Sequence, residues 1–187
     1  MPGAAPLTIE RDGFSMEIVD DEEATRFQVA WTEADGRSAR LELAVGRPPD
    51  LESLNVVIPW SDEIFNFTSK QWLRPVTGVL VVGDDRRPIG GDDGEAWAAL
   101  DVGRGRWPQE IRWNWGGAGG RQGDRLVGLQ FGAKWTEGTG STENGFVVDG
   151  RLTKLGHELE WTYDWDRPLD PWTVRDPGGQ LDVVPSP

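Results

Sequence analysis

The sequence predicts an all-β protein of antiparallel strands, arranged as a β-barrel or a strongly twisted sandwich with little helix. Apolar residues recur at every second position in most segments, which is the period of a strand with one buried face. Turn-forming pairs of Gly, Asp and Pro separate these segments at short intervals. The 25 Gly and 13 Pro interrupt any helical pattern, so we expect at most one helical turn, near Asp62–Ile64.

Four strands are predicted from alternation alone. Their apolar positions are Phe27/Val29/Trp31, Leu41/Leu43/Val45, Leu54/Val56/Ile58 and Leu129/Phe131/Ala133/Trp135. A further apolar strand, Trp97–Leu100, is expected to end just before Asp101. The glycine cluster Gly116–Gly120 precedes neither a Lys-Ser/Thr pair nor a helix, so we interpret it as a flexible hairpin loop and not as a phosphate-binding loop.

Two hairpins are predicted toward the C-terminus. The first joins Asn144–Val148 to Arg151–Leu155 through Asp149-Gly150, a pair that readily adopts the positive φ angles of a two-residue turn. The second is expected to turn at Gly156–Glu158 and to continue through residues 159–165.

Alternation in residues 159–165 places Trp161, Tyr163 and Trp165 on one face of that predicted strand. Such a face either packs in a core between sheet layers or lines a ligand pocket. The sequence leaves both interpretations open.

The 187 residues are enough for one domain with a substantial core, so we expect a single β domain over residues 1–187. The first dozen residues and the segment 176–187 are rich in Pro and Gly. We expect these ends, residues 1–12 and 176–187, to be frayed.

Charge and composition exclude several classes of function. The formal net charge of -13 opposes binding to nucleic acid, which requires clustered Lys and Arg. The absence of cysteine excludes disulfides and thiolate metal sites. The single histidine, His157, falls in a predicted exposed turn, so neither a Ser-His-Asp triad nor a His-rich metal site is expected. We therefore predict no metal and no cofactor.

The start of the chain lacks the positive charge and apolar run of a signal peptide. No segment approaches the roughly 20 apolar residues of a membrane-spanning helix. We expect no membrane span and a cytoplasmic location.

Eleven tryptophans suggest an aromatic-walled interior, because Trp brings a large contact area and one N–H that seeks a partner when buried. Several of them fall within about thirty residues. The candidate ligand-binding residues are Trp60, Lys70, Trp107, Trp113, Asn114, Trp115, Trp135, Asn144, Trp161 and Tyr163.

Three carboxylates are candidate catalytic residues. Asp101, at the end of an apolar strand, could act as a general acid if burial raises its pKa, or could simply accept turn hydrogen bonds or pair with Arg104 or Arg106. Glu137 and Glu143 flank Gly138–Gly140, where they could converge at a pocket mouth or satisfy amides of a tight loop.

Lys70 and Lys134 are expected to point outward, as most strand lysines do. A lysine that pointed inward would need a carboxylate partner, and Asp101, Glu137 and Glu143 are the candidates.

Several ordered motifs resemble the family called domain of unknown function 2804. The resemblance covers roughly Leu51 to Val174, about two thirds of the chain. The motifs that carry it are Ser53–Ser61, Phe67–Gln71, Asp101–Pro108, Trp113–Trp115, Lys134–Gly140, Thr142–Asn144 and Val148–Leu152.

That family is in turn distantly similar to the carotenoid 1,2-hydratase and lipocalin-like cyclase group, which resembles tandem antiparallel barrels holding polyene or polyketide ligands. The resemblance implies a lipocalin-like (calycin-like) barrel. It also implies longer relatives with a second barrel-like half, so we expect a short member or an excised unit that could form a homodimer or pair with a second barrel-like domain.

The function expected from these observations is binding of a small hydrophobic molecule, such as a polyene, polyketide or isoprenoid, in an aromatic-lined cavity. One alternative is a cofactor-independent hydratase, isomerase or cyclase in which Asp101 or Glu143 protonates the ligand and indole rings stabilise the cation. The other alternative is a structural or interaction domain whose core is filled by side chains.

Overall fold

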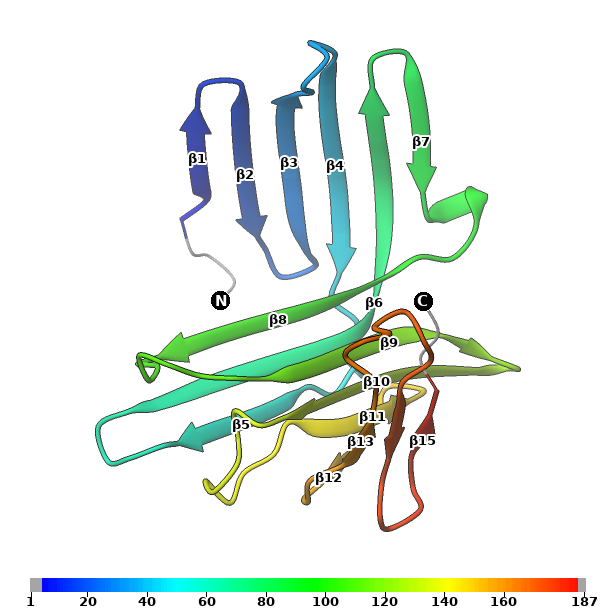
Figure 1. Ribbon diagram of the computed structural model, residues 1–187. Coiled ribbons are helices and arrows are strands. Elements are labelled where there is room, and N and C mark those ends of the chain that lie inside the picture. The colour runs from blue at the N-terminus through cyan, green and yellow to red at the C-terminus, as the bar shows by residue number, and fades with distance from the viewer. Residues whose placement is uncertain (1–4, 185–187) are drawn as a thin grey trace.

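The computed structural model describes residues 5–184 and confirms the all-β class (Figure 1). The strands form antiparallel sheets, and among the described residues no sheet closes into a barrel. Of the two predicted arrangements, the open sheets are consistent with a twisted sandwich. The one helical element in this part of the chain is a 3-10 turn, η1 (Gly91–Asp93); the turn expected near Asp62–Ile64 is a non-helical bend.

The N-terminal strands form a meander. Its strands are β1 (Leu7–Arg11), β2 (Phe14–Asp20), β3 (Ala24–Thr32) and β4 (Ser38–Gly46), each paired with the next. In β3 the predicted positions Phe27, Val29 and Trp31 are half-buried and alternate with exposed residues. Residues 7–11, within the segment expected to be frayed, pair with β2, while residues 1–4 lie outside the described part.

The 18-residue strand β6 (Phe65–Val82) belongs to two sheets (Figure 1). Its C-terminal half pairs with β4 and with β7 (Asp85–Ile89), which extends the meander. Its N-terminal half pairs with β5 (Leu54–Pro59) and β8 (Trp97–Gly105). The register shifts between Gln71 and Arg74, and Leu73 has a φ of 63°, the geometry of a β-bulge. At this bulge the strand turns from one sheet into the other.

A separate four-stranded sheet packs against the sheet made by β5, the N-terminal half of β6 and β8. It has the order β12-β11-β10-β9, with bounds β9 (Asn114–Gln122), β10 (Arg125–Ala133), β11 (Asn144–Val148) and β12 (Arg151–Leu155). The core between the sheets consists of Leu54, Val56, Ile58, Trp72, Leu73, Trp135 and Val147. A Cβ at Gly128 of β10 would lie 2.7 Å from the Trp72 Cβ, so the glycine permits this close approach.

The predicted hairpin at Asp149-Gly150 is confirmed, with β11 and β12 paired from Asn144↔Leu155 to Val148↔Arg151. The predicted second hairpin is wrong. The strand β13 (Glu160–Thr162) pairs with β14 (Thr173–Arg175), and β14 pairs with β15 (Asp182–Val183).

The aromatic contacts give the physical reason for this pairing. Trp172, just before β14, stacks on Tyr163 with ring centroids 4.6 Å apart and contacts Trp161 edge-on. These contacts tie residues 160–163 to a segment further along the chain. Of the C-terminal segment expected to be frayed, residues 182–183 form β15, and residues 185–187 lie outside the described part.

The interpretation of Gly116–Gly120 as a hairpin loop is also wrong, because these residues lie within strand β9 and pair with Val127–Phe131 of β10. A Cβ at Gly116 would lie 2.4 Å from the Phe131 ring. The glycines therefore make room for large neighbouring side chains, and the turn itself is at Gly123, with a φ of 60°.

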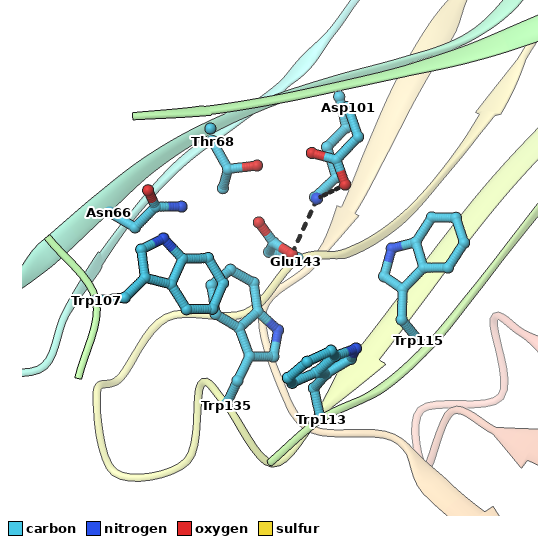
Figure 2. Close-up of a pocket in the computed structure, with 10 residues that line it drawn as sticks. Asn66, Thr68, Asp101, Trp107, Trp113, Trp115, Trp135 and Glu143 are labelled. Atoms are coloured by element: carbon cyan, nitrogen blue, oxygen red, sulfur yellow. Dashed lines mark hydrogen bonds and ion pairs between the residues drawn. The ribbon is translucent and has the colours of Figure 1, made fainter. Parts of the chain in front are cut away.

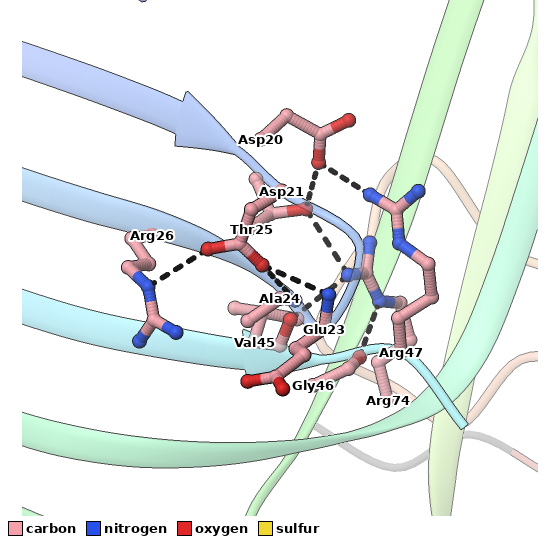
Figure 3. A network of polar contacts seen from close by, with 10 residues as sticks. All are labelled: Asp20, Asp21, Glu23, Ala24, Thr25, Arg26, Val45, Gly46, Arg47 and Arg74. Atoms are coloured by element: carbon pink, nitrogen blue, oxygen red, sulfur yellow. Dashed lines mark hydrogen bonds and ion pairs between the residues drawn. The ribbon is translucent and has the colours of Figure 1, made fainter. Parts of the chain in front are cut away.

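A buried arginine holds the bulge of β6 against the end of the meander (Figure 3). The Arg74 guanidinium donates hydrogen bonds to the carbonyls of Val45 and Gly46 at 2.9 and 2.8 Å and to the Thr25 hydroxyl at 3.1 Å. The Thr25 hydroxyl in turn donates to Asp20 at 2.7 Å. Burial lowers the pKa of Arg74 from its ordinary value. Arg74 therefore links the bulge of β6 to the start of β3 and the end of β4.

Replacing Arg74 with Met should lower the free energy of unfolding by about 3 kcal/mol, because buried acceptors lose their donor. Urea denaturation measures this change. Arg86→Met, which alters an exposed arginine on β7, is the matched control and should change stability by less than about 0.5 kcal/mol. Equal effects in the two variants would contradict the role given to Arg74.

Candidate functional site

A pocket of about 380 Å³ opens between the β6–β8 pair and the tryptophan-bearing segments around β9 and β10 (Figure 2). Its wall is formed by β6, β8 and β9, by the loops before β9 and after β10, and by the residue before β11. The lining residues are Asn66, Thr68, Lys70, Asp101, Gly103, Trp107, Trp113, Trp115, Trp135 and Glu143.

Strand β6 turns three polar side chains into the pocket. Asn66, Thr68 and Lys70 alternate with Phe65 and Phe67, and it is the phenylalanines that face outward, with exposures of 45% and 42%. This is the reverse of the usual pattern, in which apolar side chains point inward. Asn66 and Thr68 were missed by the sequence reasoning. Polar residues at alternate positions beside Phe were the signal that could have found them.

A charged group forms the floor of the pocket. Lys70 is buried, and its Nζ lies 2.5 Å from Asp101 Oδ2 and 3.3 Å from Glu143 Oε2. Asp101 is opposite Lys70 in the β6–β8 register, in the middle of β8 and not at the strand end that we expected. Lys70 therefore points inward, contrary to the expected outward orientation, and meets two of the three carboxylates named for it. Lys134 is exposed.

Glu143 is the most buried carboxylate of the group. Burial raises the pKa of its carboxyl, while the charge of Lys70 and the Thr68 hydroxyl oppose this rise without cancelling it. Asp101 is less buried, because about half of its side chain is exposed. Burial thus favours the protonated form of Glu143.

The segment around Glu143 is held rigidly. The Asn144 Oδ1 accepts a hydrogen bond from the Gly132 N–H at 2.8 Å, and its Nδ2 donates to the His157 carbonyl at 3.0 Å. The Thr142 hydroxyl donates to the Leu155 carbonyl at 2.5 Å. Asn144 thus positions the carboxylate and does not itself line the pocket.

Several buried oxygen atoms of the lining residues have no hydrogen-bond partner of good geometry among the described residues. They are Asn66 Oδ1, Thr68 Oγ1, Glu143 Oε1 and Glu143 Oε2. Buried polar atoms in folded proteins are nearly always paired, so a cluster of exceptions in one pocket requires an explanation.

Indole rings form the opposite wall. Trp107 and Trp135 stack in parallel, with centroids 5.1 Å apart and planes at 4°. Trp60 supports this stack from behind, tilted against both rings, and its Nε1 donates to the Trp135 carbonyl at 2.8 Å. Trp113 and Trp115 stand at the exposed side of the pocket.

The remaining candidate residues lie elsewhere. Asn114 lines a separate hollow with Lys134 and Trp165. Trp161 and Tyr163 belong to an aromatic cluster with Phe131 and Trp172 that covers the end of the sandwich. Glu137 is exposed in the turn after β10. The structure does not bring these residues into the pocket.

The His157 ring contacts the buried carboxylate of Asp176, a contact that the interpretation of His157 as a turn residue did not include. Within residues 5–184, no group of His, Asp or Glu side chains has the arrangement of a metal site. In the same range, no helix is long and apolar enough to cross a membrane.

Residues 2–187 match the model of a family described as "Domain of unknown function (DUF2804)". The match extends the resemblance beyond Leu51–Val174 to nearly the whole chain. No curated protein and no solved structure matches the chain.

Replacing Glu143 with Gln should stabilise the protein at high pH. The folded-state pKa of this carboxyl lies above its unfolded value, so its ionisation destabilises the fold as the pH rises through the folded-state pKa. We expect wild type and variant to be equally stable near about pH 4 and the variant to be more stable by about 1 kcal/mol near about pH 8, measured by urea denaturation.

Glu137→Gln, which changes an exposed carboxyl in the neighbouring turn, is the matched control. The same trend with pH in both variants would show that the effect does not arise from the buried carboxyl.

Proposed function

The chain belongs to the DUF2804 family, and we propose that it binds a small molecule with a large apolar surface in the tryptophan-lined pocket. The observation that carries the proposal is the combination of four indole rings, from Trp107, Trp113, Trp115 and Trp135, with a compact polar floor. Small-molecule sites are typically apolar and aromatic pockets of roughly 300–1,000 Å³ that hold a few convergent polar groups. This pocket has that size and that composition.

The exposure of the indole rings supports binding over a filled core. Trp107, Trp113 and Trp115 are each about half exposed or more, although they surround a hollow in which they could bury much of their surface. A bound apolar molecule would remove that surface from water, at about 25 cal/mol per Å².

The proposed ligand class is polyene-, polyketide- or isoprenoid-like. The resemblance to the carotenoid 1,2-hydratase and lipocalin-like cyclase group supports this choice, although the open sandwich is not a lipocalin barrel. The flat surface of the stacked Trp107 and Trp135 rings also fits an extended or planar apolar body.

Trp107→Leu should weaken binding of an apolar probe by about tenfold, because a single well-packed indole contributes roughly 1–3 kcal/mol. Saturable quenching of tryptophan fluorescence by retinol, farnesol and a butyl-substituted naphthalene measures the affinity. Trp31→Leu, in the N-terminal meander, is the matched control and should leave affinity unchanged.

If no probe gives saturable quenching, the proposal is wrong and a structural or interaction role is favoured. An equal loss of affinity in the two Trp variants would place the binding site outside this pocket.

A second candidate function is acid catalysis on the bound molecule, and the burial of Glu143 favours it. Burial raises the pKa of the Glu143 carboxyl, which favours the protonated form that a general acid requires. This carboxyl could protonate a carbon–carbon double bond of the ligand, and nearby indole faces would stabilise the resulting cation. Water would then add to the cation and give a proton back to the carboxylate. Alternatively, a carbon next to the cation would give a proton to the carboxylate, which forms a double bond at a new position.

In this reaction Glu143 is the acid, and Asp101 is the ion-paired neighbour that holds Lys70. Glu143→Gln should reduce conversion of a bound polyene by at least about a hundredfold while leaving its affinity within about threefold. Mass spectrometry of the ligand after incubation measures conversion, and Glu137→Gln is the control. Equal conversion by wild type and Glu143→Gln would remove the assignment, and binding alone would remain.

A further inference from the structure

The unpartnered oxygens on the pocket floor indicate what the inner end of a ligand must offer. Asn66, Thr68 and Glu143 are 1%, 2% and 1% exposed, and all three line the pocket (Figure 2). Each carries at least one buried oxygen that has no hydrogen-bond partner of good geometry among the described residues, and the Thr68 hydroxyl also lies close enough to Glu143 to lower the pKa of its carboxyl. The amide and carboxyl oxygens accept hydrogen bonds, and the hydroxyl both accepts and donates. A hydrogen-bond donor on the ligand would complement these acceptors.

The charges on the floor argue against an anionic group there. Two carboxylates, Asp101 and Glu143, share the single ammonium of Lys70. Lys70 already contacts both, so it has little capacity to bind a further anion. A negatively charged group on the ligand would be repelled by the carboxylates, because the pocket floor is poorly solvated.

The position of Lys70 also disfavours a positively charged group on the ligand. Its Nζ lies 3.3 Å from Glu143 Oε2, so a second cation bound to this carboxylate would lie close to the first. A neutral hydroxyl avoids this repulsion. It can donate to Asn66, Thr68 or Glu143, and its oxygen can accept a hydrogen bond as well.

The acceptor atoms are spread along the pocket floor. Asn66 and Thr68 are two residues apart on β6, so their Cα atoms are separated by about 7 Å, and two hydroxyls can serve them better than one. Space in front of them is kept open by Gly103, which pairs with Thr68 across the β6–β8 ladder. A Cβ at this position would lie 3.3 Å from Asn66 Nδ2.

We infer that the ligand carries at least two hydroxyl groups at the end that enters the pocket, bound by Asn66, Thr68 and Glu143, while its apolar body lies against the indole wall. This inference rests on the proposed binding function. It narrows the ligand to a polyhydroxylated molecule with an apolar body, and it assigns binding roles to Asn66 and Thr68.

A matched series of probes tests the inference. Each probe is a naphthalene ring that bears a butyl chain. The free end of the chain carries no hydroxyl, one hydroxyl, two hydroxyls on adjacent carbons, or an ammonium group. Affinities are measured from the fluorescence anisotropy of the naphthyl ring. The dihydroxy probe should bind at least about tenfold more tightly than the unsubstituted one, and the ammonium probe should bind less tightly than the dihydroxy probe.

Thr68→Val removes one partner of the hydroxyls without changing the shape of the side chain. It should reduce the preference for the dihydroxy probe at least about threefold and leave the affinity of the unsubstituted probe unchanged. Thr77→Val, at an exposed position on the same strand, is the matched control. Valine keeps the shape of the threonine side chain, so the variant should remain folded, and its urea denaturation curve checks this.

The outcomes separate this inference from the binding function on which it rests. Equal affinity for the unsubstituted and dihydroxy probes, tightest binding of the ammonium probe, or an unchanged preference in Thr68→Val would overturn the inference while leaving the binding function in place. Failure of every probe to bind would overturn both.

Discussion

The bulge in β6, held by the buried guanidinium of Arg74, is the constraint on which the rest of the structure depends. Arg74 binds the carbonyls at the end of β4, so the meander ends where β6 changes sheet. A bulge adds a residue to one strand and bends it. Before the bulge, Asn66, Thr68 and Lys70 are buried; after it, Val76 and Val79 are buried. The bulge therefore joins the two sheets, and the half of β6 that precedes it carries a polar row on its buried face.

Placing that polar row inside the fold is costly, and the surrounding packing must offset it. Lys70 is tolerated because two carboxylates lie against its ammonium, and Glu143 is tolerated because Lys70 and Thr68 partly compensate for its burial. Even so, oxygens of Asn66, Thr68 and Glu143 have no good partners among the described residues. Leu54, Ile58, Trp72 and Val147 form an apolar core next to this row, and Leu54 and Ile58 are opposite Lys70 and Asn66 in the β5–β6 ladder. Proteins commonly violate a packing rule where they function and offset the violation elsewhere.

Two aromatic groups have different roles in this architecture. Trp107 and Trp135 stack beside the polar floor with Trp60 tilted against both, so apolar surface and hydrogen-bonding groups meet in one pocket. Trp172 contacts Trp161 and Tyr163, and Trp161 also contacts Phe131, so these rings link β13 to the segment before β14. The first group fits a bound molecule with an apolar body and a hydroxylated end, whereas Trp161 in the second group packs against the core around Phe131. A count of tryptophans cannot separate these roles.

The sequence by itself determined the features that depend on neighbouring residues. Alternation is a local property, and it predicted the strands around Phe27 and Leu54; the Asp149-Gly150 pair predicted the β11–β12 turn, because its backbone preference is local as well. Only the tertiary structure decided that Gly116–Gly120 is a strand, since its partner Phe131 fills the space that glycine leaves. The tertiary structure likewise decided that Lys70 points inward with Asn66 and Thr68, because the carboxylates that pair with Lys70 on this face come from segments that are distant in the sequence. A two-residue period shows that a strand has two faces, but long-range packing selects the face that is buried.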